Sequence, residues 1–228
     1  MRLEKISNEY TLNIFTDVSV KQVNRKFNTC YGAVAVVEDK VIDEIFRFNS
    51  DSTVNEGEAK GIQTGIYFAL KYKDQFKTIN LFSDSLISIN NIRYGYQKWY
   101  SIDDRLLRFD KNNPDVKNSS VYIQIFDLLA RYKLNVNFWH VKGHIGYSKN
   151  DLSKLIYAFI KNNNIFDDGW DYNFARYLAK WNNYVDIKSR DILHKNIHTN
   201  IITPFHFTAN KFEIIKNSYN YFKEEIKQ

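Results

Sequence analysis

The distribution of apolar and polar positions predicts three consecutive strands, followed by strands and helices in alternation. Two of the first three strands are separated by only three residues, EDK, which indicates a hairpin. The polar, basic stretch KQVNRKFNTC is predicted to be a connection before that hairpin. The runs rich in β-branched and aromatic residues, which define the predicted strands, are 11–18, 31–37, 41–48, 78–83 and 134–141.

Helical spacing of apolar residues fills the intervals between the later strands. A helix is predicted over 58–73, another after residue 85, and a third over 119–132, where a serine stands at the predicted N-cap. Residues 100–117 are polar and are expected to form a loop or a short irregular element. The apolar face of the first helix consists of Ala59, Ile62, Ile66 and Leu70.

This order of elements predicts an α/β fold. We expect a mixed five-stranded sheet, in which an antiparallel meander of three strands joins parallel strands and helices cover the faces. The chain has 228 residues, enough for one large domain or for one domain with an appendage. Hydrophobic residues make up 44% of it, so a sizeable core can form.

Composition also indicates the class of binding partner and the cellular compartment. The net charge of +6 and the pI of about 9.1 suit an anionic partner, with nucleic acid the first choice. Cys30 is the single cysteine, which excludes an internal disulfide framework and a multi-cysteine zinc site. No signal-peptide core or membrane-length apolar run is present, so we expect a soluble, cytoplasmic protein that does not bind a membrane.

Three acidic residues stand out by their positions. Asp17 ends the first strand in FTDVS, Glu58 begins the first helix in NEGEA, and Asp84 ends the fourth strand in FSDS. In a sheet of this order they can meet, and carboxylates that meet repel one another unless a cation lies among them. Oxygen ligands favour Mg²⁺ or Mn²⁺, and two such ions about 4 Å apart can direct water onto a phosphodiester. The alternative is ordinary N-capping or a favourable charge at a helix start.

In their order along the chain, TDVS, NEGEA, FSDS and HVKGH resemble the ribonuclease H family, over roughly residues 10–194. The resemblance implies a ribonuclease H-like fold and four carboxylates that bind two Mg²⁺ ions, for which Mn²⁺ can substitute. Asp17, Glu58 and Asp84 match the first three carboxylates. Glu56 is a nearby rival to Glu58, but Asn55 before Glu58 and an alanine after it fit the family's helix start better.

The fourth carboxylate does not follow from a simple count. In the family, a helix after the glycine-histidine loop opens with Asn and carries Asp four residues later. Here Asn150 plus four gives Lys154, a cation. Either the site has three acids, or Asp151 substitutes for the fourth, or the motif lies further along the chain.

An Asn-x-x-x-Asp spacing further along the chain occurs at Asn182 and Asp186. Val185 before the acid and Arg190 after it also resemble the family's helix start, so we prefer Asp186 as the fourth metal ligand. The alternative is a solvated helix acid paired with Arg190.

This choice makes residues 145–181 a helical insertion, in which 173–181 form a second short helix. The catalytic domain is then expected to span 1–194, and 195–228 to be a C-terminal extension packed on it. The helical pattern in the insertion rests on the apolar residues Leu152, Leu155, Ile156, Phe159 and Ile160.

His144 matches the family's loop histidine, which implies assistance to proton transfer or product departure. By the same resemblance, Asn55 is a candidate contact to the RNA 2′-OH and Thr53 to a phosphate of the DNA strand. Ser85 and Trp99 complete the expected substrate contacts; Trp99 lies in the basic, aromatic segment RYGYQKWY. The alternatives are turn chemistry or an N-cap for the polar residues and packing on the sheet for the aromatic ones.

The expected activity is therefore metal-dependent endonucleolytic hydrolysis of the RNA strand of RNA–DNA hybrids, with water as the nucleophile. We expect a monomer. One alternative keeps the fold but acts on DNA, as a nuclease or a strand-transfer enzyme. Another is a catalytically inactive nucleic-acid-binding module, which would follow if the fourth carboxylate were absent.

Overall fold

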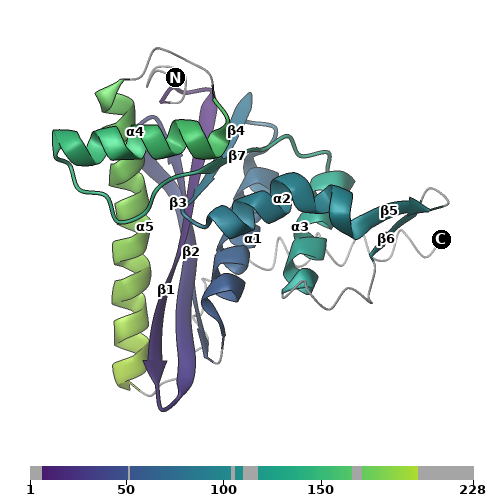
Figure 1. The fold of residues 1–228 in the computed structure, drawn as a ribbon, viewed down its shortest axis with the longest axis horizontal. Coiled ribbons are helices and arrows are strands. Elements are labelled where there is room, and N and C mark those ends of the chain that lie inside the picture. Colours follow the sequence, from purple (N-terminus) through teal and green to yellow (C-terminus); the bar gives the residue numbers. More distant parts are fainter. Residues whose placement is uncertain (1–6, 51, 104–105, 110–117, 166–170, 200–228) are drawn as a thin grey trace.

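The computed structural model describes residues 7–50, 52–103, 106–109, 118–165 and 171–199 (Figure 1). A five-stranded sheet with the order β3-β2-β1-β4-β7 forms its centre. Strands β1, β2 and β3 are antiparallel neighbours, whereas β4 and β7 run parallel to β1, as predicted. The sheet strands are β1 Thr11–Val23, β2 Lys26–Val37, β3 Lys40–Ser50, β4 Thr78–Ser83 and β7 Asn137–His140.

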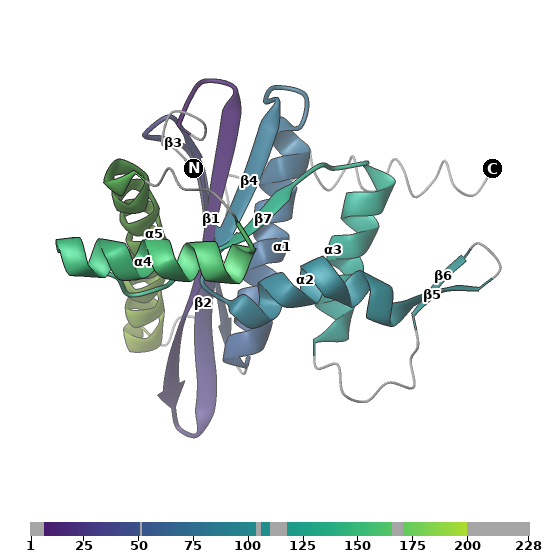
Figure 2. The ribbon, with the colours of Figure 1, turned by 45° about the horizontal axis from the view of Figure 1, so that its top comes forward.

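Helices cover both faces of this sheet, which confirms the predicted α/β class (Figures 1 and 2). The helices are α1 Val54–Tyr72, α2 Leu86–Trp99, α3 Ser119–Arg131, α4 Lys149–Asn163 and α5 Tyr172–Thr199. One face packs against α1, α2 and α3, and the other against α4 and α5. Among the helices of the described residues, none combines the length and apolar character that crossing a membrane requires.

Alternating side chains of β1 and β4 supply both cores. Ile14 pairs in register with Leu81 on the α1 side, and Phe15 with Phe82 on the α5 side. The rings of Phe15 and Phe82 stack with their centroids 4.7 Å apart, and both side chains are fully buried. Burial of one such side chain contributes about 2 kcal/mol, so this central pair contributes strongly to holding the parallel strands together.

A row of asparagines, of which Asn13 and Asn80 are buried, fixes the register of β1, β4 and β7. Asn80 of β4 donates to Asn13 Oδ1 of β1 at 3.0 Å, and its own Oδ1 accepts from Asn137 Nδ2 at 3.2 Å and from Trp139 Nε1 at 3.0 Å, both of β7. A shift of one residue would place each amide on the opposite face, without these partners. The row therefore sets which residues stand together where the strands end.

The first hairpin is longer than the sequence pattern predicted. KQVNRKFNTC was expected to be a connection, but β1 and β2 stay paired through Val23 and Lys26. Asn24 and Arg25 form the turn with φ of 50° and 64°, the left-handed geometry of a tight two-residue hairpin. The polarity misled because the ends of both strands extend as a ribbon with solvent-exposed positions, where polar side chains suit a strand as well as a loop.

Helix α5 also departs from the prediction. Residues 173–181 were expected to form a separate short helix, but they are the first part of one continuous helix of 28 residues. The segment 172–199 contains no glycine or proline, so nothing in it interrupts the helix. The predicted boundary at residue 181 therefore falls within α5, and the predicted extension begins inside it; residues 200–228 lie outside the described part.

Two smaller predictions are also corrected. β5 Tyr100–Asp103 and β6 Leu106–Phe109 pair as a second, antiparallel sheet of two strands where a loop or irregular element was expected; residues 104–105 and 110–117 are outside the described part. The N-cap of α3 is Asn118, with φ of 67°, rather than a serine.

Candidate active site

The sheet topology itself brings two of the predicted carboxylates together. β1 and β4 pair in parallel up to Thr16 and Ser83, and the next residue of each chain is an aspartate, Asp17 or Asp84. Beyond this point β4 turns into α2 while β1 continues beside β2. The edge of β1 is thus open where Asp17 lies, and the turn after β4 places Asp84 next to it.

Glu58 reaches the same point from α1. The helix starts at Val54, after the N-cap Thr53, and Glu58 lies at the end of the first turn. One carboxylate oxygen each of Asp17, Glu58 and Asp84 lies within 4.8 Å of the others. The rival Glu56 lies elsewhere, in an i,i+4 ion pair with Lys60 at 2.5 Å, which lowers the pKa of Glu56. The structure therefore gathers Glu58, and not Glu56, with the two aspartates.

The three clustered carboxylates repel one another; Asp17 is buried, and Glu58 and Asp84 are partly buried. Burial is the main cause that raises the pKa of Asp17 and Glu58 well above the usual range, and the negative charge of Asp84 raises both further. Burial also raises the pKa of Asp84, although the nearby His144 opposes this effect. Each group is therefore unfavourable in its ionised form unless positive charge is supplied.

Two oxygen atoms of the cluster indicate what would supply that charge. Glu58 Oε2 and Asp84 Oδ1 are buried and have no hydrogen-bond partner among the described residues. A buried oxygen without a partner costs about 1–3 kcal/mol, and more when charged. Hard divalent cations such as Mg²⁺ bind oxygen ligands of this kind, so the donor set fits a metal ion.

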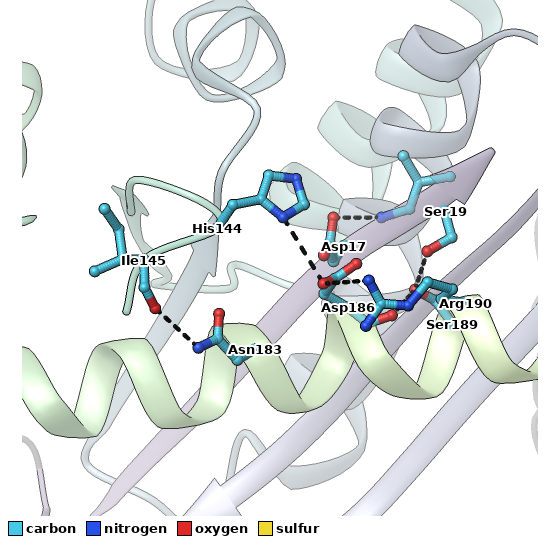
Figure 3. A network of polar contacts seen from close by, with 9 residues as sticks. Asp17, Ser19, His144, Ile145, Asn183, Asp186, Ser189 and Arg190 are labelled. Atoms are coloured by element: carbon cyan, nitrogen blue, oxygen red, sulfur yellow. Dashed lines mark hydrogen bonds and ion pairs between the residues drawn. The ribbon is translucent and has the colours of Figure 1, made fainter. Parts of the chain in front are cut away.

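Asp186 of α5 lies beside this cluster (Figure 3). Its side chain is 16% exposed, and its charge contributes to the raised pKa of both Asp17 and Asp84. The helix that carries it is fixed to β1 by a 2.9 Å hydrogen bond between the buried hydroxyls of Ser19 and Ser189. Asp186 thus faces the three clustered acids from the α5 side.

Asp151 has a different position. It lies in the first turn of α4, where its backbone N–H donates to Ser148 Oγ at 3.1 Å and Ser148 Oγ donates to its Oδ2 at 2.6 Å. These reciprocal contacts cap the helix. Asp151 is not part of the carboxylate cluster, so Asp186 is the acid that the fold brings next to Asp17 and Asp84.

His144 lies in the loop between β7 and α4, and its side chain is 78% exposed. Its Nδ1 is 3.8 Å from Asp186 Oδ2, and Arg190 Nη1 is 3.7 Å from the same oxygen (Figure 3). The loop is attached to α5 by a 3.0 Å hydrogen bond from Asn183 Nδ2 to the Ile145 carbonyl. The histidine is thus held at the solvent side of the four acids.

His140 is a buried neighbour of the site that sequence reasoning missed. It pairs in register with Ser83 at the end of β7, and its Nε2 lies 3.1 Å from the backbone oxygen of Asp84. Its Nδ1 lies 3.0 Å from Asn162 Nδ2 of α4. Burial lowers the pKa of His140, which favours the neutral ring. Its place at the end of the strand beside Asp84 was the signal that could have revealed this contact.

Three of the predicted substrate contacts, Thr53, Asn55 and Ser85, lie at the starts of α1 and α2. Thr53 is exposed and caps α1 by accepting from Glu56 N–H at 3.3 Å, and Asn55 is exposed in the same turn. Ser85 caps α2, with its Oγ accepting from Ser88 N–H at 3.3 Å. Trp99 ends α2, but its side chain lies outside the described part. The two capping roles match the alternatives that turn chemistry suggested, and neither excludes contact with a ligand.

The family follows from the match of a family model. The model for RNase H matches residues 9–154, and the chain therefore belongs to the RNase H family. The matched segment includes Asp17, Glu58, Asp84 and His144, but it ends before α5 and so before Asp186. None of the curated proteins matches the chain.

Several solved structures resemble the chain. A foamy viral protease-reverse transcriptase in complex with RNA/DNA hybrid is 17% identical, with a TM-score of 0.47, and the match covers 77% of this chain and 20% of that one. RNase H1 from the halophilic archaeon Halobacterium salinarum is 17% identical, with a TM-score of 0.41 and coverages of 58% and 86%. The RNase H domain of prototype foamy virus is 13% identical, with a TM-score of 0.47 and coverages of 72% and 99%. The chain spans about a fifth of the length of the foamy viral protease-reverse transcriptases that it matches.

Proposed function

We propose that the protein is an endoribonuclease that hydrolyses the RNA strand of RNA–DNA hybrids, with two Mg²⁺ ions and water as the nucleophile. The observation that carries this proposal is the convergence of Asp17, Glu58 and Asp84 from β1, α1 and the end of β4, with Asp186 of α5 beside them. Membership of the RNase H family supports it independently.

Asp17, Glu58 and Asp84 would hold the metal, with Asp186 completing the ligand set from the solvent side. When bound, divalent cations would supply the positive charge that offsets the four acids, polarises the phosphodiester and makes water a better nucleophile. The unpartnered oxygens of Glu58 and Asp84 are the atoms that such binding would satisfy. Mn²⁺ prefers similar oxygen ligands and should substitute for Mg²⁺.

His144 and Arg190 would act on the solvent side of these ligands. The exposed ring of His144 lies 3.8 Å from Asp186, and imidazole is a common proton carrier in enzymes, so we assign His144 to proton transfer or product departure. Arg190 lies one helical turn from Asp186 and keeps that carboxylate oriented. Asp186 would thus be positioned by a cation on its own helix and approached by a histidine from the loop.

Recognition of the hybrid would use exposed polar groups near the start of α1 and α2. We assign Asn55 to contact the 2′-OH that distinguishes RNA from DNA, and Thr53 and Ser85 to contact phosphates; Asn55 and Thr53 are exposed, and Ser85 is partly exposed. Trp99 is proposed as a further contact. We also propose that residues 1–194 form one catalytic unit, in which 145–181 are an insertion that displaces the fourth acid along the chain.

One assay tests this proposal against its alternatives. The protein is incubated with matched RNA–DNA, RNA–RNA and branched DNA substrates, each with Mg²⁺ or EDTA, and the products are resolved by length. We expect cleavage of the RNA strand of the hybrid only, dependent on Mg²⁺ and lost in the Asp84→Asn variant. Cleavage of branched DNA instead would overturn the substrate assignment, and binding without cleavage would show an inactive binding module.

A further inference from the structure

A groove with three lysines runs along α4, next to the candidate active site. It has a volume of about 590 Å³ and lies between the helix and the end of β7. Figure 2 shows α4 lying across the strands of the sheet, in front of them. The side chains that matter for the argument are Lys142, Lys154, Lys161, Tyr157, His140 and Asn162.

The lysines of this groove carry unneutralised charge. Lys142, Lys154 and Lys161 are all exposed, and none forms an ion pair with a residue of the described part. The single acid within α4, Asp151, is engaged with Ser148 at the start of the helix. A concave surface with several free cations attracts a polyanion and raises its local concentration.

The spacing of the two lysines and the tyrosine on α4 places all three side chains on one face of the helix. Lys154, Tyr157 and Lys161 follow at i, i+3 and i+7, which is one helical face. Along the helix axis the two lysines are about 10 Å apart, close to the rise of three nucleotides at about 3.4 Å each. Tyr157 lies between them and is 68% exposed, so its ring is accessible to a bound partner.

The groove also adjoins the clustered acids. His140 lines it and contacts the backbone oxygen of Asp84 at 3.1 Å, while Asn162 of α4 contacts the other ring nitrogen. Lys142 directly precedes Gly143, the residue of the loop that passes against Asp84. The groove and the clustered acids therefore share His140 and the start of the loop after β7 as neighbours.

We propose that this groove binds the sugar-phosphate backbone of a nucleic-acid strand that extends beyond the active site, an inference that rests on the proposed function. Lys154 and Lys161 bind phosphates as point charges, and Lys142 binds the phosphate nearest the acids. Tyr157 provides a flat surface on which a sugar or an unpaired base stacks. The helical insertion thus enlarges the substrate footprint of the domain.

The test measures binding separately from cleavage. The affinity of a fluorescein-labelled 20-base-pair RNA–DNA hybrid is measured by anisotropy, with Ca²⁺ in place of Mg²⁺, at several salt concentrations. The variant is Lys154→Glu/Lys161→Glu. The matched control is Lys73→Glu/Lys133→Glu, which makes the same change in net charge at exposed lysines; Lys73 lies about 22 Å from Glu58 along the axis of α1. Circular dichroism melts check that both variants fold.

We expect the groove variant to bind about tenfold or more weakly, and the slope of log K against log salt to fall by about 2, because each lost phosphate contact removes about 0.9. The control should stay within about twofold of wild type. Equal affinities for the groove variant and the control would overturn the proposal. The two proposals fail separately: a wild-type protein that binds but never cleaves refutes the proposed activity, whereas a cleaving protein with no lysine effect refutes the groove.

Tyr157→Ala tests the stacking part alone. We expect weaker binding to a hybrid that carries a single-stranded extension, by about fivefold or more, with the salt slope unchanged, because a stacking contact is not ionic. An affinity equal to that of wild type would remove Tyr157 from the proposal.

Discussion

Gly143 passes so close to Asp84 that a methyl group at its Cα would lie 2.2 Å from Asp84 Oδ2. The backbone of Gly143 is not in the left-handed region, so an alanine there would be strained by the carboxylate and not by its own conformation. The loop that carries His144 can therefore pack against Asp84, a proposed metal ligand, only because residue 143 is a glycine and has no side chain.

Gly143→Ala should consequently impair activity by moving Asp84 or the loop. We expect the rate of hybrid cleavage to fall about tenfold or more, since displacements near 1 Å at a reacting centre have effects of this size. Gly146→Ala is the matched control, because its Cβ would meet Asp151 Oδ2 at 2.7 Å instead. If Asp151 only caps α4, this control keeps its activity; equal losses in the two variants would argue against the assignment.

The clustered acids predict how metal and pH act on stability. Their pKa values are raised in the folded protein, so without metal they contribute stability below the unfolded pKa, near pH 4, and lose it as the pH rises through the raised values. Mg²⁺ should therefore raise the melting temperature more at pH 7.5 than at pH 5. Thermal melts with Mg²⁺ or EDTA measure this, and a Mg²⁺ effect that is the same at both pH values would contradict it.

Asp84→Asn should separate stability from function. Removing one of three repelling charges is expected to raise the melting temperature in EDTA at pH 7.5 by a few degrees, which corresponds to about 1 kcal/mol for a chain of this size. The same variant should lose the stabilisation by Mg²⁺ and the cleavage activity. A lower melting temperature in EDTA would indicate that Asp84 has a structural role that the raised pKa does not reveal.

The row of asparagines across β1, β4 and β7 predicts that a substitution outside the candidate active site lowers the free energy of unfolding strongly. Asn80→Leu would leave Asn13 Oδ1, Asn137 Nδ2 and Trp139 Nε1 without the partners they have now. We expect a loss of about 3 kcal/mol in the free energy of unfolding, measured by urea denaturation. Asn135→Ala, at an exposed position just before β7, is the control and should change it by less than about 0.5 kcal/mol.

Much of the fold could be predicted because each strand carries its own signal. The predicted strand 78–83 coincides with β4. Because β1 and β4 are parallel and their pairing ends at Thr16 and Ser83, the sequence could predict that the next residues, Asp17 and Asp84, lie close together. The hairpin turn at Asn24 and Arg25 could not be predicted from polarity, since exposed strands and loops favour the same residues.

The fourth acid was harder because spacing alone offered two candidates. Asn182 and Asp186 fit the motif, but only the packing of α5 against β1, including the contact between Ser19 and Ser189, shows that this acid reaches the others. The contact of His140 with the backbone oxygen of Asp84 was missed, although the place of His140 at the end of a strand beside Asp84 was a signal for it.

The most direct test of the central claim compares Asp186→Asn with Asp151→Asn in Mg²⁺-dependent cleavage of an RNA–DNA hybrid. The account predicts that Asp186→Asn reduces the cleavage rate by about a hundredfold or more, because the fourth ligand beside Asp17 and Asp84 is lost, while Asp151→Asn stays within about threefold of wild type. An active Asp186→Asn variant together with an inactive Asp151→Asn variant would contradict it.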